Sequence, residues 1–443
     1  MYASKPLTII REGASFSMYH LEHDRPIVQK YGGTSVGSLE RIDAVAKRVA
    51  DQYHAGYKKI AIVVSAMSGE TNRLVDLVNG INARTSPRNY DMVVAAGEQI
   101  SVALMASALE KHGIPSKAFL GYQLGIVTDN FHSKARIEKI ECAKLYQCWK
   151  EDAIPVVAGF QGVTGDLEIT TLGRGGSDTS AVALAVALDA AFCEINTDVD
   201  GVFTADPRIV PEARLVEEID FEVALEMASL GSKVLHSRCV ELGAKYHMPI
   251  VVRNTFKAND QARTYIMNFS TERKLEAPIV SGVTLDKNVV RISLHNLPAR
   301  GGIIGSAFEV IASNGVNVDI IVHNRSNDSD RMRVGFTIGN ADLLRTKEIL
   351  ERWTLEKKLG AYIEVEEGLS KVSVVGLGMQ SHPGVASRVF SVLEDAGIAL
   401  HMISTSEIKI SCVIGEKEGE VAARALHKEF VVPEIEVEVE LKT

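Results

Sequence analysis

The chain has 443 residues, of which 46% are hydrophobic, so it can bury a substantial core and is expected to form two or three domains. Its formal net charge of −9 argues against a broad basic surface for nucleic acid or an anionic membrane. No apolar run approaches the roughly 20 residues that span a bilayer, and no signal-peptide core opens the chain, so we expect a cytoplasmic protein.

The first glycine-rich segment, VQKYGGTSVGS at residues 28–38, follows some 25 residues without clear periodicity. A lysine beside paired glycines suits a nest of backbone N–H groups around a phosphate. A plain strand-to-helix turn explains the same letters equally well. These eleven residues alone leave both interpretations open.

Residues 26–270 alternate short apolar runs with longer helical patterns. Buried strands of a parallel sheet are predicted within 59–67, 154–160 and 248–254, and helices within 92–113 and 177–191. This alternation indicates an α/β layered domain. Glu98 stands inside the first apolar helix, where a buried carboxylate is costly, so it either faces water or meets a cation.

A second glycine-rich segment, TTLGRGGSDTSAVAL, opens the helix predicted from residue 177. Ser177 or Asp178 can cap that helix, whose N-terminal N–H groups favour an anion. The guanidinium of Arg174 suits a carboxylate or a phosphate. A capped helix with a solvent-facing arginine is the plainer alternative.

The next segment, NTDVDGVFTADPR at 196–208, is a long loop after a predicted strand. Loops at the carboxyl ends of parallel strands hold ligands in open α/β sheets. Its Asp and Arg residues therefore suit a nucleotide. An ordinary surface loop is the plainer alternative. Lys233 follows a Gly-Ser turn. Alone it indicates only a solvated surface charge, and it becomes a candidate site residue because the two glycine-rich segments and the Asp-rich loop also suit an anionic ligand.

An internal repeat appears after about residue 280, where 301–321 aligns with 383–403. Each copy reads as a glycine loop, a helix, a glycine turn and a strand, which suits a ferredoxin-like module. The segment 275–288 is the expected joint between this repeat and the preceding half.

Several familiar site patterns are missing from the chain. There is no GxxxxGK[ST], GxSxG or HExxH, the five cysteines form no CxxC pair, and the histidines show no metal-ligand spacing. Two anion loops, two lysines and an Asp-rich loop instead favour phosphoryl transfer. No general base is conspicuous, which fits an acceptor that is already ionised, such as a carboxylate.

The chain resembles the aspartate kinases of the amino-acid kinase superfamily in six ordered segments: KYGGTSVGS, VVSAMSGET, AAGEQIS, TTLGRGGSDTSAVALA, NTDVDGVFTADPR and GSKVLHSR. Residues 1–25 lack clear periodicity and are expected to form an arm, which departs from the family pattern. The resemblance implies an α/β catalytic domain at 26–275 with an amino-acid-kinase-type layered sheet and helices on both faces. It further implies two ferredoxin-like ACT modules, at 289–365 and 370–443.

The activity that this resemblance implies is transfer of the γ-phosphate of ATP, accompanied by Mg²⁺, to the side-chain carboxylate of L-aspartate. The products are 4-phospho-L-aspartate and ADP, in the first step toward lysine, threonine and methionine. Lys30 and Lys233 would neutralise the transferring group, and Asp178 would orient them. No residue is expected to bind metal directly.

The same resemblance implies binding roles along the chain. The expected ATP-binding residues are Lys30, Tyr31, Gly32, Gly33, Thr197, Asp198, Phe203, Arg208 and Lys233. Arg174 would clamp a substrate carboxylate and Glu98 would take its ammonium. The remaining expected substrate contacts are Ser65, Thr71, Gly175, Gly176 and Ser177.

The ACT modules would bind lysine, threonine or both as feedback inhibitors and would join subunits into a homo-oligomer. The expected effector-binding residues are Gly302, Asn317, Asp319, His323, Val385, Ala386, Ala399, Leu400 and Ser406. Two alternatives to an aspartate kinase remain open. They are a superfamily kinase for another carboxylate or carbamate, and a non-catalytic ACT-type amino-acid sensor.

Overall fold

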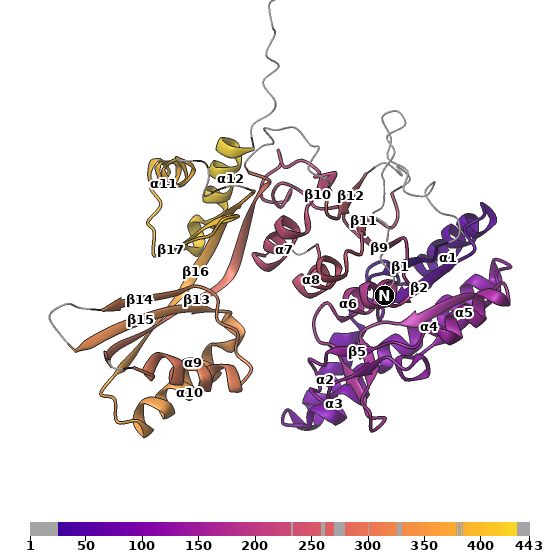
Figure 1. Cartoon of the computed structure of the whole chain (residues 1–443), viewed down its shortest axis with the longest axis horizontal. Coiled ribbons are helices and arrows are strands. Elements are labelled where there is room, and N and C mark those ends of the chain that lie inside the picture. Colours follow the sequence, from indigo (N-terminus) through magenta and orange to yellow (C-terminus); the bar gives the residue numbers. More distant parts are fainter. Residues whose placement is uncertain are drawn as a thin grey trace, which may run out of the picture. The chain divides into compact units, whose positions relative to one another are not determined.

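The computed structural model describes residues 25–231, 234–257, 262–269, 280–299, 301–325, 330–377, 379, 382 and 384–431. These residues form two compact units, whose elements are labelled in Figure 1. The N-terminal unit contains residues 25–202, 215–229 and 234–269. The C-terminal unit contains residues 203–214 and 230–231 together with the described residues from 280 onward. Of the expected N-terminal arm, only Arg25 lies within the described residues.

The N-terminal unit is built on an eight-stranded sheet with the order β10-β12-β11-β9-β1-β2-β6-β3. Neighbouring strands run parallel except β11 and β12. The runs IAIVV and IPVVA of β2 and β6 are wholly buried, as expected for parallel strands covered on both faces. The strands are β1 (Ile27–Tyr31), β2 (Ile60–Val64), β3 (Ser116–Phe119), β6 (Ile154–Ala158), β9 (Phe192–Thr197), β10 (Glu218–Ile219), β11 (Ile250–Asn254) and β12 (Arg263–Ile266). The three strands predicted from sequence are therefore confirmed as β2, β6 and β11.

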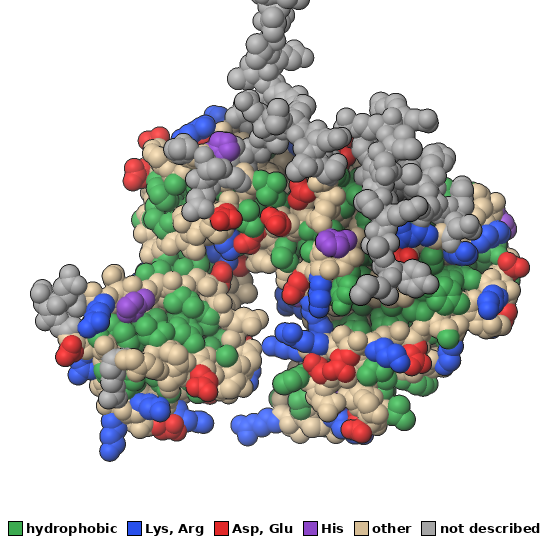
Figure 2. Space-filling model, viewed as in Figure 1, with side chains coloured by type: hydrophobic (Ala, Val, Ile, Leu, Met, Phe, Trp, Pro, Cys, Tyr) green, Lys and Arg blue, Asp and Glu red, His purple; other side chains and the backbone are tan. Residues whose placement is uncertain are grey.

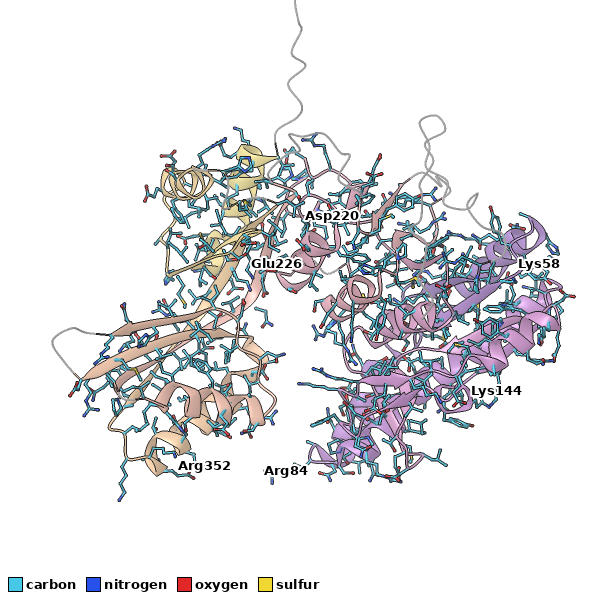
Figure 3. The ribbon with its side chains drawn as sticks, viewed as in Figure 1. Lys58, Arg84, Lys144, Asp220, Glu226 and Arg352 are labelled. Atoms are coloured by element: carbon cyan, nitrogen blue, oxygen red, sulfur yellow. The ribbon has the colours of Figure 1, made fainter. Side chains whose placement is uncertain are left out.

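Helices cover both faces of this sheet, which confirms the expected fold class. Neighbouring residues of a strand point to opposite faces. Tyr31 of β1 packs with α1 and α4, whereas the adjacent Lys30 meets Asp178 of α6. Asp220, labelled in Figure 3, precedes α7, and its carboxylate accepts a hydrogen bond from the Phe269 N–H (3.2 Å). The helices of this unit are α1 (Leu39–His54), α2 (Glu70–Asn82), α3 (Pro87–Val94), α4 (Ala96–Lys111), α5 (Ala143–Lys150), α6 (Gly176–Ala187), α7 (Phe221–Ser229), α8 (Ser237–Tyr246) and the 3₁₀ turn η2 (Gly121–Leu124).

The helical run Pro87–Lys111, formed by α3 and α4, is long and apolar enough by length and composition to cross a membrane. The sequence analysis found no apolar run of that length, because polar residues such as Glu98 interrupt it. Half of its most apolar stretch is buried inside the unit, and the core helix of a globular protein passes the same test. This single helix is weak evidence for a membrane span.

A small four-stranded sheet, with the order β5-β4-β7-β8, stands beside the main sheet. Its strands are β4 (Val127–Thr128), β5 (Ile137–Lys139), β7 (Gln161–Val163) and β8 (Ile169–Thr171). Four residues after β8, the chain enters α6. The small sheet thus holds the starting point of the Leu172–Gly175 loop that contains Arg174.

The C-terminal unit contains one six-stranded sheet with the order β14-β15-β13-β16-β18-β17. The helix pairs α9 with α10 and α11 with α12 pack against it (Figure 1). The two repeat helices, α9 and α11, follow Gly302 and Gly384, which both have positive φ. The strands are β13 (Gly282–Pro298), β14 (Ile321–Arg325), β15 (Arg331–Ile338), β16 (Tyr362–Val375), β17 (Met402–Thr405) and β18 (Lys409–Gly415). The helices are α9 (Ile303–Ser313), α10 (Leu343–Glu356), α11 (Val385–Asp395), α12 (Gly419–Phe430) and the turns η3 (Asn340–Asp342) and η4 (Glu416–Glu418).

Two long strands, β13 and β16, run through both halves of this sheet. The segment 275–288, expected as a joint, is described from Val280, and its part from Gly282 onward belongs to β13. Val283 is buried in the core of the C-terminal unit, so this stretch is a structural strand and not a connecting loop. The first half of β13 pairs with the end of β16, and the second half pairs with β15.

The segment 203–214, which follows β9 along the chain, packs in the C-terminal unit and not in the N-terminal one. Ala205 and Val210 are buried in the cluster formed by α11, α12 and their strands. Thr204 Oγ1 lies 2.8 Å from Nε2 of His427, and Arg424 donates to the carbonyl of Ile209 (3.2 Å). A continuous domain over 26–275, as expected from sequence, therefore differs from the structure at this insertion, whose partners lie more than 200 residues later.

Candidate active site

The carboxyl ends of β1, β2 and β9 meet at one edge of the main sheet. Lys30 is the penultimate residue of β1, Ser65 directly follows β2, and Thr197 ends β9. Because these strands are parallel neighbours, their last residues lie side by side. In open α/β sheets this edge is where ligands bind.

Lys30 and Asp178 form a nearly buried ion pair at this edge. Nζ of Lys30 lies 2.6 Å from Oδ1 of Asp178, and the two side chains are 10% and 14% exposed. Asp178 is in the first turn of α6, where a carboxylate is also stabilised by the helix dipole. The structure thus brings together two of the three expected catalytic residues. The third, Lys233, lies outside the described residues.

The glycine pair after β1 makes a tight turn, and the backbones of Asn196 and Ala66 approach it closely. Gly32 N–H donates to the carbonyl of Asn196 (3.2 Å), so it is already engaged inside the protein. A Cβ added to Gly33 would lie 3.0 Å from the carbonyl oxygen of Ala66, tighter than side chains normally tolerate. The pair therefore lets the β1 and β2 loops approach, and a Cβ on Gly32 would lie 3.2 Å from Nζ of Lys30, so Gly32 adjoins that lysine.

Tyr31 is buried in the hydrophobic core and does not face the carboxyl edge with Lys30. Its side chain is fully enclosed, and its hydroxyl donates to Oε1 of Gln29 (3.2 Å). Burial raises the pKa of Tyr31 to about 12. Strand alternation turns the Tyr31 side chain to the opposite face from Lys30, so only the backbone of Tyr31 lies at this edge, and its expected role in ATP binding stays a prediction.

Glu98 is buried beside the end of β2, so it does not face water. Its Oε1 accepts a hydrogen bond from the Ala66 N–H (3.0 Å), while Oε2 has no hydrogen-bond partner among the described residues. Burial raises the pKa of Glu98 to about 7, although the Ala66 N–H opposes that shift. Gly97 permits this arrangement, because a Cβ there would lie 2.8 Å from Cβ of Ala66. A buried carboxylate with one free oxygen is ready to receive a cation.

The loop Leu172–Gly175 presents an exposed Arg174 at the N-terminus of α6. Gly173 and Gly175 both have positive φ, which glycine adopts without strain. Arg238 holds the loop by donating to the carbonyls of Leu172 (2.8 Å) and Ala135 (2.6 Å). The Arg174 side chain has no ion-pair partner within the described part of the chain.

The other expected substrate contacts lie around this loop and around β2. Gly176 is the first residue of α6, and a Cβ there would lie 2.8 Å from Cδ2 of Phe160. Ser177 is buried against Gly159, and a Cβ added to Gly159 would lie 2.8 Å from the Cβ of Ser177. Ser65 and Thr71 are half-buried, at the end of β2 and in the first turn of α2.

His236 is a site residue that the sequence analysis did not identify. It precedes α8, and its Nδ1 accepts from the Arg238 N–H (3.4 Å) as a helix cap. Burial lowers the pKa of His236, while nearby Asp178 opposes the shift. The imidazole packs so closely on Gly175 that a Cβ there would lie 2.3 Å from Cβ of His236. The signal for this residue was its helix-capping position within GSKVLHSR.

The expected nucleotide residues divide between the two units. Thr197 and Asp198 lie in the N-terminal unit, where the Thr197 carbonyl accepts from the Thr255 N–H (2.8 Å). Asn254 supports the same loop by donating to the Asp198 carbonyl (3.1 Å) and to Oδ1 of Asp200 (3.0 Å). Sequence reasoning missed this support, because β11 and β9 are distant in the chain.

Phe203 and Arg208 belong to the C-terminal unit. Arg208 is paired there with Asp206, whose Oδ2 lies 2.6 Å from Nη2. The two residues therefore sit on an insertion with its own packing partners. Their expected contact with ATP stays a prediction.

The expected effector residues fall into two groups within the C-terminal unit. Gly302 caps α9, and Asn317, Asp319 and His323 are exposed around the start of β14. Asp319 is paired with Lys371, a buried lysine of β16 that the sequence analysis did not identify. The second group lies around α11 and β17 and consists of Val385, Ala386, Ala399, Leu400 and Ser406.

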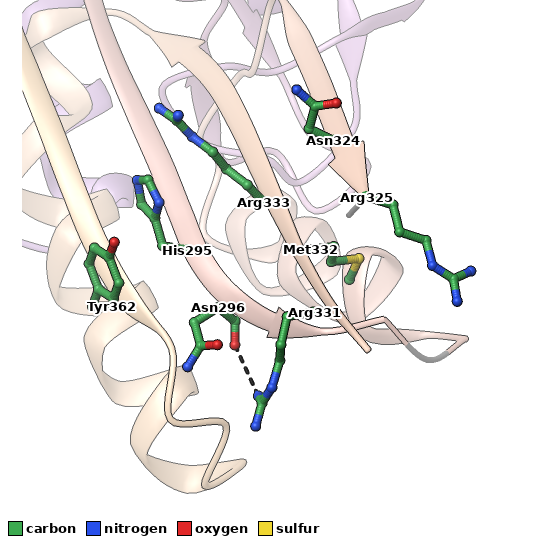
Figure 4. Close-up of a pocket in the computed structure, with 8 residues that line it drawn as sticks. All are labelled: His295, Asn296, Asn324, Arg325, Arg331, Met332, Arg333 and Tyr362. Atoms are coloured by element: carbon green, nitrogen blue, oxygen red, sulfur yellow. Dashed lines mark hydrogen bonds between the residues drawn. The ribbon is translucent and has the colours of Figure 1, made fainter. Parts of the chain in front are cut away.

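A shallow pocket of about 580 Å³ opens on the C-terminal unit (Figure 4). Its lining is rich in cations, and three of them have internal partners, namely His295, Arg331 and Arg333. Arg331 donates to the Asn296 carbonyl (3.1 Å), and His295 pairs with Glu364 (2.7 Å). None of the expected catalytic or effector residues lines it. The lining residues are His295, Asn296, Asn324, Arg325, Arg331, Met332, Arg333 and Tyr362.

Comparison with known proteins agrees with this geometry. Residues 25–254 match the amino acid kinase family, and residues 372–430 match an ACT domain. The chain is 46% identical to an aspartokinase of Pseudomonas aeruginosa over 405 residues, 91% of this chain and 97% of that protein. It is also 46% identical to an aspartokinase of Geobacillus stearothermophilus over 408 residues, 92% and 98% of the two chains.

The fold resembles that of a solved relative throughout. Escherichia coli aspartokinase III in complex with aspartate and ADP has a TM-score of 0.77 and 26% identity, covering 92% of this chain and 100% of that one. The same enzyme in complex with lysine and aspartate has a TM-score of 0.69 and 26% identity, covering 91% and 99%. The chain therefore belongs to the aspartokinase family, whose members use ATP to phosphorylate the side-chain carboxylate of aspartate.

Proposed function

We propose that Lys30, Asp178 and Lys233 form the catalytic group of this aspartate kinase. The 2.6 Å pair of Lys30 with Asp178 at the carboxyl edge of the sheet is the observation that carries the proposal. Lys30 and Lys233 neutralise the γ-phosphoryl group, and Asp178 orients Lys30. An oxygen of the aspartate side chain attacks the γ-phosphorus, and the bond to the bridging oxygen of ADP breaks. The acceptor carboxylate is ionised at neutral pH, so no base need remove a proton.

The substrate is held by opposite charges at its two ends. Arg174 binds a carboxylate of L-aspartate, and Glu98 binds its ammonium. The unpartnered Oε2 of buried Glu98 supports this assignment, because an ammonium would satisfy it. Ser65, Thr71 and Ser177 add hydrogen bonds, and Gly175 and Gly176 let the loop approach the substrate.

The nucleotide lies along Lys30, Gly32, Gly33, Thr197 and Asp198 in our proposal. Mg²⁺ arrives as part of the substrate MgATP, whose phosphate oxygens are the ligands that this ion prefers. No group of three His, Cys, Asp or Glu side chains suited to a metal occurs in the part of the chain that the structure describes. All five cysteines are free thiols, which suits the reducing cytoplasm, where we place the protein.

The decisive assay traps the acyl phosphate with hydroxylamine in the presence of L-aspartate and MgATP. We expect hydroxamate to form with L-aspartate, to fall to background with excess chelator and to return with added Mg²⁺. Hydroxamate from another carboxylic acid but none from aspartate would favour a different superfamily kinase. Effector-induced thermal shifts without any turnover would favour a non-catalytic sensor.

For regulation, we propose that residues 289–365 and 370–443 are ACT modules that bind lysine, threonine or both. The exposed Asp319, which pairs with buried Lys371, offers a charged partner for an amino acid. Ile321 and Val322 are exposed at the start of β14, and Figure 2 shows hydrophobic side chains on the surface of the C-terminal unit, which supports a homo-oligomer through these modules. Titrating activity with lysine and threonine, singly and together, while following the molar mass identifies the effector and the assembly.

Changing Gly175 to alanine is expected to lower kcat/KM for L-aspartate by about 10²-fold, the usual cost of displacing a positioning group by about 1 Å. The added Cβ would lie 2.3 Å from His236, at a backbone φ of +69° that L side chains rarely adopt. Gly165→Ala is the matched control, since nothing lies within 4 Å of its Cβ. Equal kinetics for the two variants in steady-state assays would show that the Gly175 loop does not position the substrate.

A further inference from the structure

Asp91 is a buried carboxylate that the catalytic proposal does not use. It lies in α3, seven positions before Glu98 in α4, and the Ala95 N–H donates to its carbonyl (3.0 Å) across the junction of the two helices. Seven positions correspond to nearly two helical turns, so the two carboxylates stand on the same side of this run. Asp91 is thus on the element that carries Glu98.

Five hydrogen bonds converge on the Asp91 carboxylate. Oδ2 accepts from the backbone N–H groups of Ser133 (2.8 Å) and Thr171 (3.0 Å) and from Nδ1 of His132 (3.0 Å). Oδ1 accepts from the hydroxyls of Thr171 (2.7 Å) and Ser133 (3.0 Å). A fully buried carboxylate is costly unless its oxygens are satisfied, and here both are.

The partners of Asp91 support the loop that contains Arg174. Thr171 ends β8, three positions before Arg174, and its carbonyl accepts from the Ala135 N–H (3.0 Å). The carbonyl of Ser133 lies 2.9 Å from where a Cβ of Gly173 would stand. Asp91 therefore ties the start of the Arg174 loop to the helical run that carries Glu98.

We infer that Asp91 is a positioning residue that sets the separation of Arg174 and Glu98, and thereby selects a four-carbon amino dicarboxylate over longer ones. This inference rests on the proposed roles of Arg174 and Glu98, with Arg174 binding the side-chain carboxylate, because only the separation of that carboxylate from the ammonium grows with the length of the substrate. A rigid spacing between two opposite charges matches only one separation of the complementary charges on a ligand. Without the hydrogen bonds between Asp91 and Thr171, the Arg174 loop becomes more mobile, and the preference for aspartate over longer amino dicarboxylates decreases.

The sharpest test compares two neighbouring threonines of β8. Thr171→Val removes the 2.7 Å hydrogen bond to Asp91, whereas Thr170→Val removes a 2.7 Å hydrogen bond to Thr128. Both side chains are buried, so both variants lose comparable structural contacts. We expect Thr171→Val to raise KM for L-aspartate about tenfold and to narrow the preference for aspartate over glutamate. KM for ATP should change less than twofold.

Asp91→Asn extends the test, because a neutral amide oxygen accepts hydrogen bonds from the N–H groups of Ser133, Thr171 and His132 more weakly than a carboxylate oxygen does. We expect the same loss of selectivity, larger in size, in a protein that still unfolds cooperatively. If Asp91→Asn does not fold, the comparison of Thr171→Val with Thr170→Val alone tests the inference. Equal aspartate KM and selectivity in the Thr171 and Thr170 variants would overturn the inference. A wild-type protein that phosphorylates no aspartate would refute the proposed function instead.

Discussion

Replacing Lys30 with methionine is expected to lower kcat by about 10³-fold or more. A preorganised cation on a transferring phosphoryl group contributes on that scale, because the site supplies the charge without solvent reorganisation. The buried Asp178 would also lose its counter-ion, which costs about 3 kcal/mol of folding stability. Kinetics must therefore be measured below the unfolding transition of the variant, followed by circular dichroism.

Two companion variants make the Lys30 result interpretable. Lys58→Met removes an exposed lysine just before β2, at the opposite edge of the sheet from the carboxyl ends (Figure 3). It should retain wild-type kcat. A Lys30→Met/Asp178→Asn double variant removes both charges and should recover stability without recovering turnover. An unchanged rate in folded Lys30→Met would contradict the role assigned to this lysine.

The second large effect concerns Glu98 and depends on pH. The carboxyl group has a pKa of about 7, so lowering the pH below 7 protonates it and removes the anion that the substrate ammonium requires. With MgATP saturating, kcat/KM for L-aspartate is expected to fall below pH 7, approaching tenfold per pH unit. Glu98→Gln should raise KM for aspartate about 10²-fold and abolish this acid limb. An acid limb that persists in Glu98→Gln would assign it to another group.

The same substitution is expected to stabilise the protein without ligand at alkaline pH. Because the pKa of Glu98 is raised from 4.5 to about 7 on folding, the native state holds a proton that the unfolded chain releases. Stability therefore decreases as pH rises from about 4.5 to 7, by at most about 3 kcal/mol for this group. In thermal unfolding, Glu98→Gln should have a higher Tm than the wild type at pH 8 and the same Tm at pH 4.5. Parallel stability profiles for the two proteins would contradict this account.

Several parts of the site were predictable because their signals are local. Lys30 and Asp178 lie in glycine-rich segments next to a buried strand and a helix N-terminus, and such patterns span only a few residues. Their roles as partners followed from the family resemblance, and the 2.6 Å separation agrees with it. The inward direction of the Tyr31 side chain was also predictable, since neighbouring residues of a strand face opposite ways.

Other features had no local signal. Asp91 stands in the ordinary helical stretch Pro87–Val94, and its partners lie about 40 and 80 positions later. The insertion 203–214 reads as an extension of the Asp-rich loop, yet its buried residues pack beside α12. The residues around Glu98 fit either water or a cation, and the family resemblance favoured the cation; the burial of Glu98, with Gly97 bringing its helix against Ala66, has no local signal.

By itself, the sequence determined the α/β class, three strands of the main sheet, the repeat and the family. Those properties are encoded in periodicity and in short motifs, which neighbouring residues decide. Only the tertiary structure decided that Glu98 is buried with one oxygen free, that Asp91 joins its helix to the Arg174 loop, and that 203–214 belongs to the C-terminal unit. Each of these depends on contacts between residues far apart in the chain, which no local pattern records.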